Sequence, residues 1–362
     1  MSDFDPATDP ALAAIGWRAD LPAAAALAGL PPGRLARVFE QHRSGYRVTD
    51  GRREFPVQSP AAWSRQGLLP EERAAVGDWV WLDPGQDSIV ALLPRQSLLR
   101  RGAAGEHYRQ QLIAANVDSV LVVVGLDHDF NPRRMERYLL LVRASGGDPV
   151  FVLTKADRCE DTAAALAALD GLHEAGCPVF AVNAKDRASV AVLEPWLGPG
   201  RTVVLVGSSG AGKSTLTNTL LGREKMKTAA VRTGDSRGRH TTTHRTLLPL
   251  PSGGCLIDTP GMRELKLTGE EDVVAGGFED VEALGGSCRF RDCAHGAEPG
   301  CAVRAALESG ALSAQRWANY CKLQAEVAHA GQSLAAQRER RDGDKLLQRA
   351  FGKRLVDKYG RR

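Results

Sequence analysis

One short segment in the second half of the chain has the residue types and spacing that bind a nucleoside triphosphate. Residues 207–214 fit the pattern G-x-x-x-x-G-K-[ST]. The glycines let the loop turn its backbone N–H groups toward phosphate oxygens. Lys213 is expected to reach the β- and γ-phosphates, and the Ser214 hydroxyl to bind Mg²⁺. The predicted phosphate-binding residues are Gly207, Ser208, Ser209, Gly210, Ala211, Gly212, Lys213, Ser214 and Thr215.

A second segment, residues 154–157, would select guanine as the base. It follows a predicted buried strand and is similar to the Asn/Thr-Lys-x-Asp motif of GTPases. An ionised carboxylate only accepts hydrogen bonds, and guanine presents two neighbouring N–H donors where adenine presents an acceptor. A loop similar to Ser-Ala-Lys, with Asn in the first place, would contact the base through its backbone. The predicted base-binding residues are Thr154, Lys155, Ala156, Asp157, Asn183, Ala184 and Lys185.

A third segment, residues 258–261, is similar to the D-x-x-G motif of the same class. Asp258 would hold Mg²⁺ through water, and the Gly261 N–H would sense the γ-phosphate. One of the threonines at 241 and 242 would complete the metal shell in the GTP state. The magnesium residues are therefore predicted to be Ser214, Thr241, Thr242 and Asp258.

The residue that orients the attacking water is the open point of this site. Met262 stands where a glutamine is expected after D-x-x-G, and a thioether cannot orient water. His240 is the nearest candidate for a catalytic residue, since imidazole can accept a proton or polarise water. An ordinary loop histidine is the alternative. We expect low intrinsic hydrolysis, with a partner supplying the remainder.

The order of these motifs is permuted. The guanine motif and its contact loop precede the phosphate loop, the threonines and D-x-x-G, whereas GTPases ordinarily begin with the phosphate loop. The sheet is unchanged if the old termini are joined and a new break opens elsewhere. The segment after D-x-x-G, residues 262–267, then leads directly into the C-terminal domain. We expect it to carry nucleotide state to that domain.

Three of the seven cysteines gather in the C-terminal third of the chain, together with one histidine. Thiolate and imidazole ligands in this number suit one tetrahedral, structural Zn²⁺ ion. Four protein ligands leave no open position, so we predict no catalysis there. The predicted zinc ligands are Cys288, Cys293, His295 and Cys301, while Cys159, Cys177, Cys255 and Cys321 are predicted to be ordinary thiols.

Elements that position these motifs can be read from the surrounding pattern. Short strands with an Asp50-Gly51 hairpin signal predict a small β-barrel, followed by alternating strands and helices that predict a doubly wound, mainly parallel sheet. Arginines and aromatics among the barrel strands fit nucleic-acid binding, with ordinary surface arginines as the alternative; these are Arg37, Arg43, Arg47, Arg52 and Arg53, with Tyr46 and Phe55. The expected order is a lead-in at 1–33, a barrel at 34–99, a nucleotide domain at 100–270, a zinc-binding domain with helices at 271–325 and a basic helical tail at 326–362.

Composition limits the remaining possibilities. The chain of 362 residues has a net charge of +4 and 25% charged residues, as expected of a globular protein. The sequence contains neither an apolar run long enough for a membrane span nor a leader pattern, so we expect a cytoplasmic protein without a membrane partner. The odd cysteine number favours reduced thiols. Ten Lys/Arg against four Asp/Glu between Arg338 and Arg362 suit an anionic partner such as RNA, or a solvated basic helix.

Taken together, the permuted order, the GRHTTT segment at 238–243 and the Cys/His spacing closely resemble the ribosome small subunit-dependent GTPase A family. The segment 94–97 (Pro-Arg-Gln-Ser) also looks like this family. The resemblance implies an OB-fold barrel, a circularly permuted P-loop GTPase domain and a zinc domain. It further implies binding to the small ribosomal subunit and its rRNA, GTP hydrolysis to GDP stimulated by that subunit, and a role in its late maturation by a monomer.

Three other functions stay open at this point. The chain could be a permuted GTPase that acts on a different RNA or protein. An ATPase or kinase is disfavoured by Asp157. A nucleotide-gated RNA-binding module with negligible hydrolysis belongs to a different class, and Met262 keeps it open.

Overall fold

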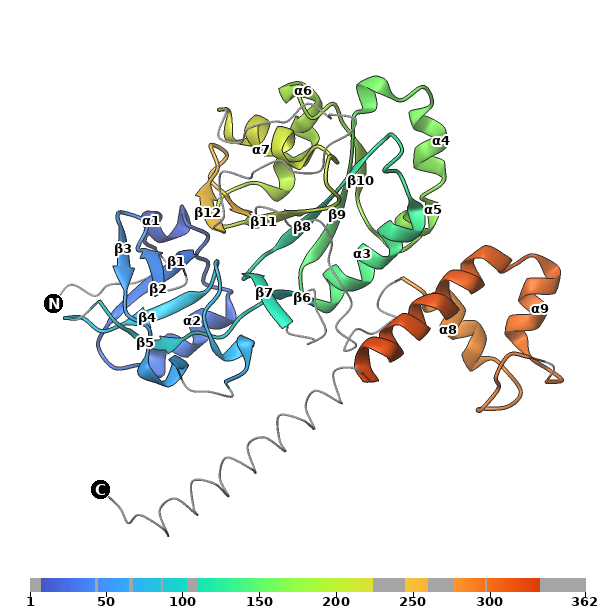
Figure 1. Ribbon diagram of the computed structural model, residues 1–362, viewed down its shortest axis with the longest axis horizontal. Coiled ribbons are helices and arrows are strands. Elements are labelled where there is room, and N and C mark those ends of the chain that lie inside the picture. The colour runs from blue at the N-terminus through green and yellow to red at the C-terminus, as the bar shows by residue number, and fades with distance from the viewer. Residues whose placement is uncertain are drawn as a thin grey trace, which may run out of the picture.

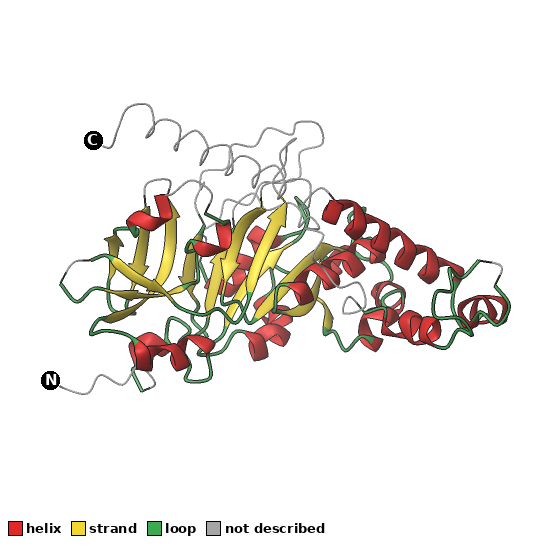
Figure 2. Ribbon diagram, turned by 90° about the horizontal axis from the view of Figure 1, so that it is seen from below, coloured by secondary structure: helices red, strands yellow, loops and turns green. Residues whose placement is uncertain are grey.

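The chain forms three parts in a row, which Figure 2 shows as a set of strands, a sheet flanked by helices and a group of helices. The computed structural model describes residues 8–42, 45–64, 68–85, 87–102, 110–223, 245–259, 277–296 and 298–332. In these ranges the apolar strands predicted from sequence form one 11-stranded sheet, which runs through the first two parts.

Five parallel strands form the middle of the nucleotide domain, in the order β10-β9-β8-β11-β13. All residues of β8 and β11 are buried, as expected of apolar strands covered on both faces. A sixth strand, β12, lies antiparallel at the β13 edge. The bounds are β8 Ser119–Gly125, β9 Asp148–Thr154, β10 Val179–Ala181, β11 Thr202–Val206, β12 Thr246–Pro249 and β13 Cys255–Asp258.

Helices cover both faces of this sheet, which confirms the doubly wound architecture (Figure 1). Alternate strand residues divide the core, since Val122 packs with helix α3 and its neighbours, and Val123 with helix α7 and its neighbours. Helix α3 begins with a typical N-terminal pattern: the Asn131 side chain accepts from the Arg134 N–H at 3.2 Å, and Pro132 occupies the first helical position. The bounds are α3 Pro132–Ala144, η4 Ala156–Arg158, α4 Thr162–Ala167, α5 Asp170–Glu174, α6 Arg187–Val190, η5 Ala191–Trp196 and α7 Lys213–Leu221.

Five strands before the nucleotide domain pair in the order β3-β2-β1-β4-β5. A single parallel bridge between Gln58 and Ser88 joins the end of β3 to the start of β5. The predicted hairpin at Asp50-Gly51 connects β2 to β3. Strand β4 begins only at Trp79, although the apolar pattern starts at Val76, because Gly77 has a φ of 96° and interrupts the extended backbone. The bounds are β1 Arg34–His42, β2 Gly45–Thr49, β3 Glu54–Val57, η2 Ala61–Ser64, η3 Pro70–Glu72, β4 Trp79–Leu82 and β5 Ile89–Leu92.

Three of the barrel residues considered for nucleic-acid contact are core residues instead. Tyr46 and Phe55 are buried in the barrel core. Arg37 is 0% exposed, and its guanidinium donates to the Thr202 hydroxyl at 2.9 Å and to backbone carbonyl oxygens of the lead-in, barrel and nucleotide domain. Arg37 therefore joins domains. The prediction of nucleic-acid contact is wrong for these three residues, because Arg37 of β1, Tyr46 of β2 and Phe55 of β3 are all buried inside the fold. Arg47, Arg52 and Arg53 do have exposed side chains.

The lead-in and the connection after the barrel pack against their neighbours. Trp17 of the lead-in meets Trp79 of β4 edge-on, with ring centroids 4.8 Å apart. In the 94–97 segment, Arg95 forms a two-pronged ion pair with the fully buried Asp78, both contacts at 2.7 Å. A hairpin that sequence patterns did not predict, β6–β7, follows. The bounds are α1 Pro10–Ala13, α2 Pro22–Ala26, η1 Leu27–Gly29, β6 Leu98–Gly102 and β7 Gln110–Ala115.

The C-terminal part is helical and shares its core with the α3 face of the sheet. It contains α8 (Glu279–Gly286), α9 (Ala302–Ser309) and a helix over residues 314–332, which we call the C-terminal helix. The predicted basic tail beyond residue 332 lies outside the described residues.

Candidate nucleotide and metal sites

The predicted nucleotide motifs meet at one edge of the sheet, although they come from distant parts of the sequence. The guanine motif follows β9, its contact loop follows β10, and the phosphate loop follows β11. Asp258 is the last residue of β13. Because these strands are parallel neighbours, their carboxyl ends lie together, where ligands bind in open α/β sheets.

Glycines shape the phosphate loop between β11 and α7. Gly207 has a φ of 139°, and a Cβ atom there would lie 2.0 Å from the carbonyl oxygen of Val123. Gly212 has a φ of 95° and is the N-cap of α7. The Lys213 ammonium donates to the carbonyl oxygens of Gly207 and Ser208 at 2.6 and 2.5 Å, so it lies over the start of the loop. Glycines with positive φ at 207, 210 and 212 are typical of loops that turn their backbone N–H groups toward a phosphate.

Thr154 links the guanine motif to the phosphate loop. Its hydroxyl donates to the carbonyl oxygen of Ala211 at 2.6 Å, and the residue is 0% exposed. A Cβ atom added at Gly212 would lie 3.0 Å from Thr154 Oγ1, so the close approach of the two segments favours glycine at position 212. Threonine in place of the commoner asparagine therefore still supplies a hydrogen bond between the two motifs.

The rest of the guanine motif is presented to solvent from η4. Lys155 is left-handed, with a φ of 63°. The Asp157 side chain is 38% exposed, and its Oδ2 lies 3.9 Å from Arg158 Nε in an ion pair at the surface. The Ala156 N–H donates to the carbonyl oxygen of Val182 at 3.3 Å, which holds the motif beside the end of β10.

The contact loop after β10 is held by its own side chains and by α7. The Asn183 side chain accepts from the Lys185 N–H at 3.1 Å, a turn that serine would also cap. The carbonyl oxygen of Ala184 accepts from the Thr219 hydroxyl at 2.6 Å. Asparagine in place of serine therefore fits the turn.

Sequence reasoning missed the loop that joins β8 to α3. Asp127 Oδ2 accepts from Lys155 Nζ at 2.5 Å, and Asp129 Oδ1 accepts from the Ser208 hydroxyl, also at 2.5 Å. Partial burial of the Asp127 carboxyl group raises its pKa, but the hydrogen bond from Lys155 outweighs this effect, and the pKa lies below its ordinary value. The position of this loop after a buried strand, at the same sheet edge, was the signal that could have revealed both aspartates.

Several predicted residues lie outside the described ranges. These are the proposed catalytic His240, the magnesium threonines Thr241 and Thr242, and Gly261, together with Met262 and the rest of the segment that leads to the C-terminal domain. Asp258 is described and pairs in register with Thr246 of β12.

The four predicted zinc ligands converge in the C-terminal part. Their ligand atoms all lie within 4.8 Å of one another. His295 Nδ1 is 3.5 Å from Cys288 Sγ and 3.6 Å from Cys301 Sγ, and the two sulfurs are 4.0 Å apart. Bonds of the usual length to a tetrahedral Zn²⁺ ion separate such ligand atoms by about 3.6–3.8 Å. The cluster therefore has the chemistry and the size to bind one zinc ion.

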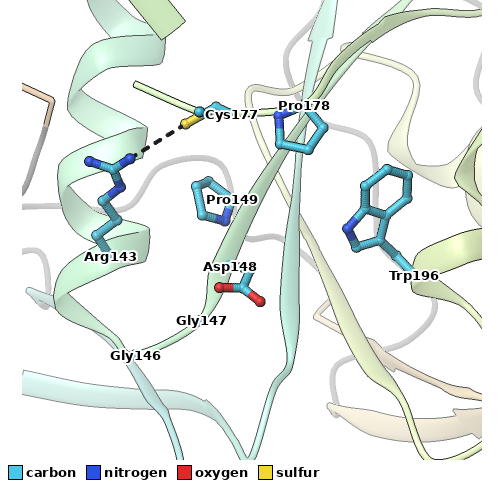
Figure 3. A pocket seen from close by; sticks show the side chains of 9 residues that line it. Arg143, Gly146, Gly147, Asp148, Pro149, Cys177, Pro178 and Trp196 are labelled. Atoms are coloured by element: carbon cyan, nitrogen blue, oxygen red, sulfur yellow. Dashed lines mark hydrogen bonds between the residues drawn. The ribbon is translucent and has the colours of Figure 1, made fainter. Parts of the chain in front are cut away.

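A hollow of about 520 Å³ lies away from these motifs, at the amino ends of β9 and β10 (Figure 3). Arg143, Cys177 and Trp196 line it. Cys177 is 4% exposed, and burial raises the pKa of its thiol despite the nearby Arg143 guanidinium. The lining residues include none of the predicted nucleotide ligands. All seven cysteines are free thiols.

Comparisons with known proteins agree with this geometry. A family profile described as RsgA GTPase matches residues 92–268. The small ribosomal subunit biogenesis GTPase RsgA of Xanthomonas oryzae is 59% identical over 373 aligned residues, which cover 100% of both chains. The structure of YjeQ from Thermotoga maritima is similar with a TM-score of 0.59 and 26% identity, over 82% of this chain and 99% of that one. YloQ, described as a circularly permuted GTPase, gives a TM-score of 0.57 and 24% identity, over 82% of this chain and 95% of its own.

The fold, the motif order and the match to the GTPase family profile define a circularly permuted GTPase. Within that class, the chain belongs to the RsgA GTPase family. Among the described residues, no helix combines the length and apolar character needed to cross a bilayer.

Proposed function

We propose that this protein is a GTPase that binds the small ribosomal subunit and acts in its late maturation. The observation that carries the proposal is the meeting of the permuted guanine and phosphate motifs at one sheet edge, in a chain that is 59% identical to a GTPase named for small-subunit biogenesis. The name of this relative supports the small ribosomal subunit as the partner, and the nucleotide motifs support GTP binding and hydrolysis.

In this proposal the two base motifs and the phosphate loop share the nucleotide. Asp157 accepts from the two N–H donors of guanine, Lys155 packs along the base, and the 183–185 loop contacts it through the backbone. The N–H groups of residues 207–215 bind the phosphates, toward which Lys213 would turn from the loop carbonyls. His240 is proposed to position water, and its segment lies outside the described residues.

Two metal ions are part of the proposal, in different roles. Ser214 and Asp258, with Thr241 or Thr242, would hold Mg²⁺, which neutralises charge on the β- and γ-phosphates when it is bound. The Cys₃His cluster would hold one Zn²⁺, whose four protein ligands give it a structural role. Cys301 is the N-cap of α9, and its sulfur accepts from the Arg304 N–H at 3.4 Å, so the metal would fix the start of that helix.

We further propose that the first five strands form an OB-fold that contacts rRNA. The pairing order, with the parallel bridge from β3 to β5, supports this fold. The exposed side chains of Arg47, Arg52 and Arg53 are ion-paired with carboxylates of this chain, and they would exchange these partners for RNA phosphates. A ribosomal partner implies a cytoplasmic location, and we propose that the free protein is a monomer.

A single assay tests the function. GTP turnover is measured for the full chain alone and with purified small or large ribosomal subunits. We expect slow turnover alone and strong stimulation by the small subunit only. Equal rates in all three reactions would contradict the proposed partner. If the GTP-bound protein binds the small subunit tightly but does not hydrolyse GTP, the result would instead favour a nucleotide-gated RNA-binding module.

A further inference from the structure

The loop between β8 and α3 carries a carboxylate whose contacts reach in two directions. Asp129 has a side chain that is 11% exposed. On one side it accepts from the Ser208 hydroxyl, with both carboxylate oxygens 2.5 Å from Ser208 Oγ. On the other side it pairs with Arg134 in the first turn of α3, where Arg134 Nη2 lies 2.6 Å from Asp129 Oδ1.

Ser208 is a point at which nucleotide binding would change the phosphate loop. Its carbonyl oxygen accepts from Lys213 Nζ at 2.5 Å, while its hydroxyl is held by Asp129. When Lys213 turns toward the phosphates, its ammonium would leave the Ser208 carbonyl oxygen. The bond from the Ser208 hydroxyl to Asp129 can stay in place, because neither of these two side-chain groups is proposed to bind the nucleotide. Asp129 therefore holds the first turn of the loop during the exchange.

Helix α3 continues from this anchor to the C-terminal helix. Arg133 Nη2 donates to Gln315 Oε1 at 2.5 Å, and Asn319 Nδ2 donates to Glu136 Oε2 at 3.1 Å. One turn further, Arg137 Nη2 lies 2.7 Å from Glu326 Oε1. Three polar contacts thus join the first half of α3 to the C-terminal helix.

The C-terminal helix in turn contacts the proposed zinc cluster. The ring of His295 meets Trp317 edge-on, with centroids 5.4 Å apart and planes at 88°. Trp317 stacks on Tyr320 at 5.5 Å. A continuous set of contacts therefore runs from Ser208 through Asp129, α3 and the C-terminal helix to a zinc ligand.

We infer that Asp129 is a positioning residue that holds the phosphate loop through Ser208 and fixes it to α3, the helix on which the C-terminal helix docks. This inference rests on the proposed nucleotide site and deepens it. It assigns the linkage between nucleotide and C-terminal domain to described residues, in addition to the segment after D-x-x-G expected from sequence. Contacts alone do not demonstrate energetic coupling, so the tests below ask whether nucleotide binding at the phosphate loop changes the C-terminal helix through Asp129.

The first test is a double-mutant cycle on the full chain, with Asp129→Asn, Ser208→Ala and the double variant. Binding of GDP and of guanosine is measured by calorimetry. A hydrogen bond to a charged group is worth roughly tenfold or more in an equilibrium constant. We expect each single variant to lose about tenfold in GDP affinity. The double variant should bind GDP no more weakly than the single variant that binds it less tightly. Guanosine affinity should stay unchanged in all three variants. Ser208→Thr, which keeps the hydroxyl, should retain GDP affinity.

The second test follows amide hydrogen exchange with and without saturating GDP. In the wild type, GDP should slow exchange in the phosphate loop, in α3 and over residues 314–332. In Asp129→Asn the protection of the phosphate loop should remain, while that of residues 314–332 is lost. Asp148→Asn, which removes an exposed carboxylate at the opposite sheet edge, is the matched control and should behave as the wild type.

The outcomes separate this inference from the proposed function. If the wild-type chain fails to bind GDP, the proposed function is wrong. If the wild type binds GDP but the two substitutions act additively, or if Asp129→Asn leaves the protection of residues 314–332 intact, Asp129 has no positioning role. An equal loss of GDP and guanosine affinity would also overturn the inference, because it would indicate a general loss of structure.

Discussion

The hydroxyl of Thr154 and the carbonyl oxygen of Ala211 are 2.6 Å apart and completely buried, so one hydrogen bond fastens the guanine motif to the phosphate loop. The two residues are 57 positions apart in the sequence. In space they are neighbours, because Thr154 is the last residue of β9 and Ala211 lies in the loop after β11. The bond therefore links the segment proposed to recognise the base to the segment proposed to bind the phosphates.

Thr154→Val removes that bond while nearly conserving side-chain shape. The Ala211 carbonyl would be left buried without this donor, which costs about 1–3 kcal/mol. We expect a lower free energy of unfolding by this amount and GDP affinity reduced by about tenfold. Denaturant unfolding and calorimetry check the two effects. Thr154→Ser keeps the hydroxyl and should stay near wild type; an equally large loss in this control would mean that the methyl group, not the bond, matters.

Asp157→Asn tests the choice of base. The amide offers one acceptor and one donor group where the carboxylate offers only acceptors, so it would lose at least one bond to guanine. We expect GDP affinity to fall by about 100-fold and affinity for xanthosine diphosphate to rise, since that base presents a carbonyl oxygen in place of the amino group. Competition binding with both nucleotides is the measurement. The exposed Glu160→Gln, three residues away, serves as control. Unchanged guanine preference in Asp157→Asn would remove the assigned role.

Loss of zinc should unfold the C-terminal part and leave the sheet intact. Cys293→Ala removes one of four ligands, and structural zinc contributes directly to folding. We expect one equivalent of zinc in the wild type, little in the variant, and rapid proteolysis within residues 277–332. Metal content and limited digestion report these results. Cys321→Ala removes an exposed thiol outside the cluster and should keep both the metal and the resistance to protease.

The ion pair between Arg316 and Asp280 should make docking of the C-terminal helix depend on pH. Burial raises the pKa of Asp280, but the hydrogen bonds and charge of Arg316 outweigh this effect and hold the pKa below its ordinary value of 3.8. A lowered folded-state pKa means that the stabilisation is present above pH 3.8 and is lost as pH falls below it, through the folded pKa.

The pH dependence is measured as the difference in unfolding free energy between wild type and Asp280→Asn. Because the pair is partly exposed, we expect about 0.5–1 kcal/mol at neutral pH. The difference should shrink toward zero in acid, below the ordinary aspartate pKa. A difference that stays constant into strong acid would show that the carboxylate charge contributes nothing.

Local patterns predicted much of the nucleotide site because its motifs are short and each follows a buried strand. The apolar run at residues 202–206 is typical of a buried strand, and it forms β11 over these residues. Convergence of the four cysteine and histidine ligands was likewise predicted from spacing. In each case the residues that act together are near in sequence or lie at the same end of parallel strands.

Contacts between distant segments account for what the sequence did not reveal. Asp129 carries no motif, and its partner Ser208 is far along the chain. Arg37 looked like a surface cation, but tertiary packing buries it among carbonyl oxygens from three parts of the chain. Docking of the C-terminal helix on α3 depends on side chains at its polar surface, and helical periodicity does not identify a partner for them.

Within the 11-stranded sheet, the first five strands join the strands of the nucleotide domain at a single register pair, Glu40 of β1 with Thr246 of β12. The other strand pairings of the first five strands close among themselves, within residues 34–92 of the described chain. During synthesis, the barrel can therefore complete its own hydrogen-bonded ladders long before residue 246 is made. The pairing of Glu40 with Thr246 then joins the barrel to the nucleotide-domain strands late in assembly, and neither unit needs this pairing to form its own strand ladders.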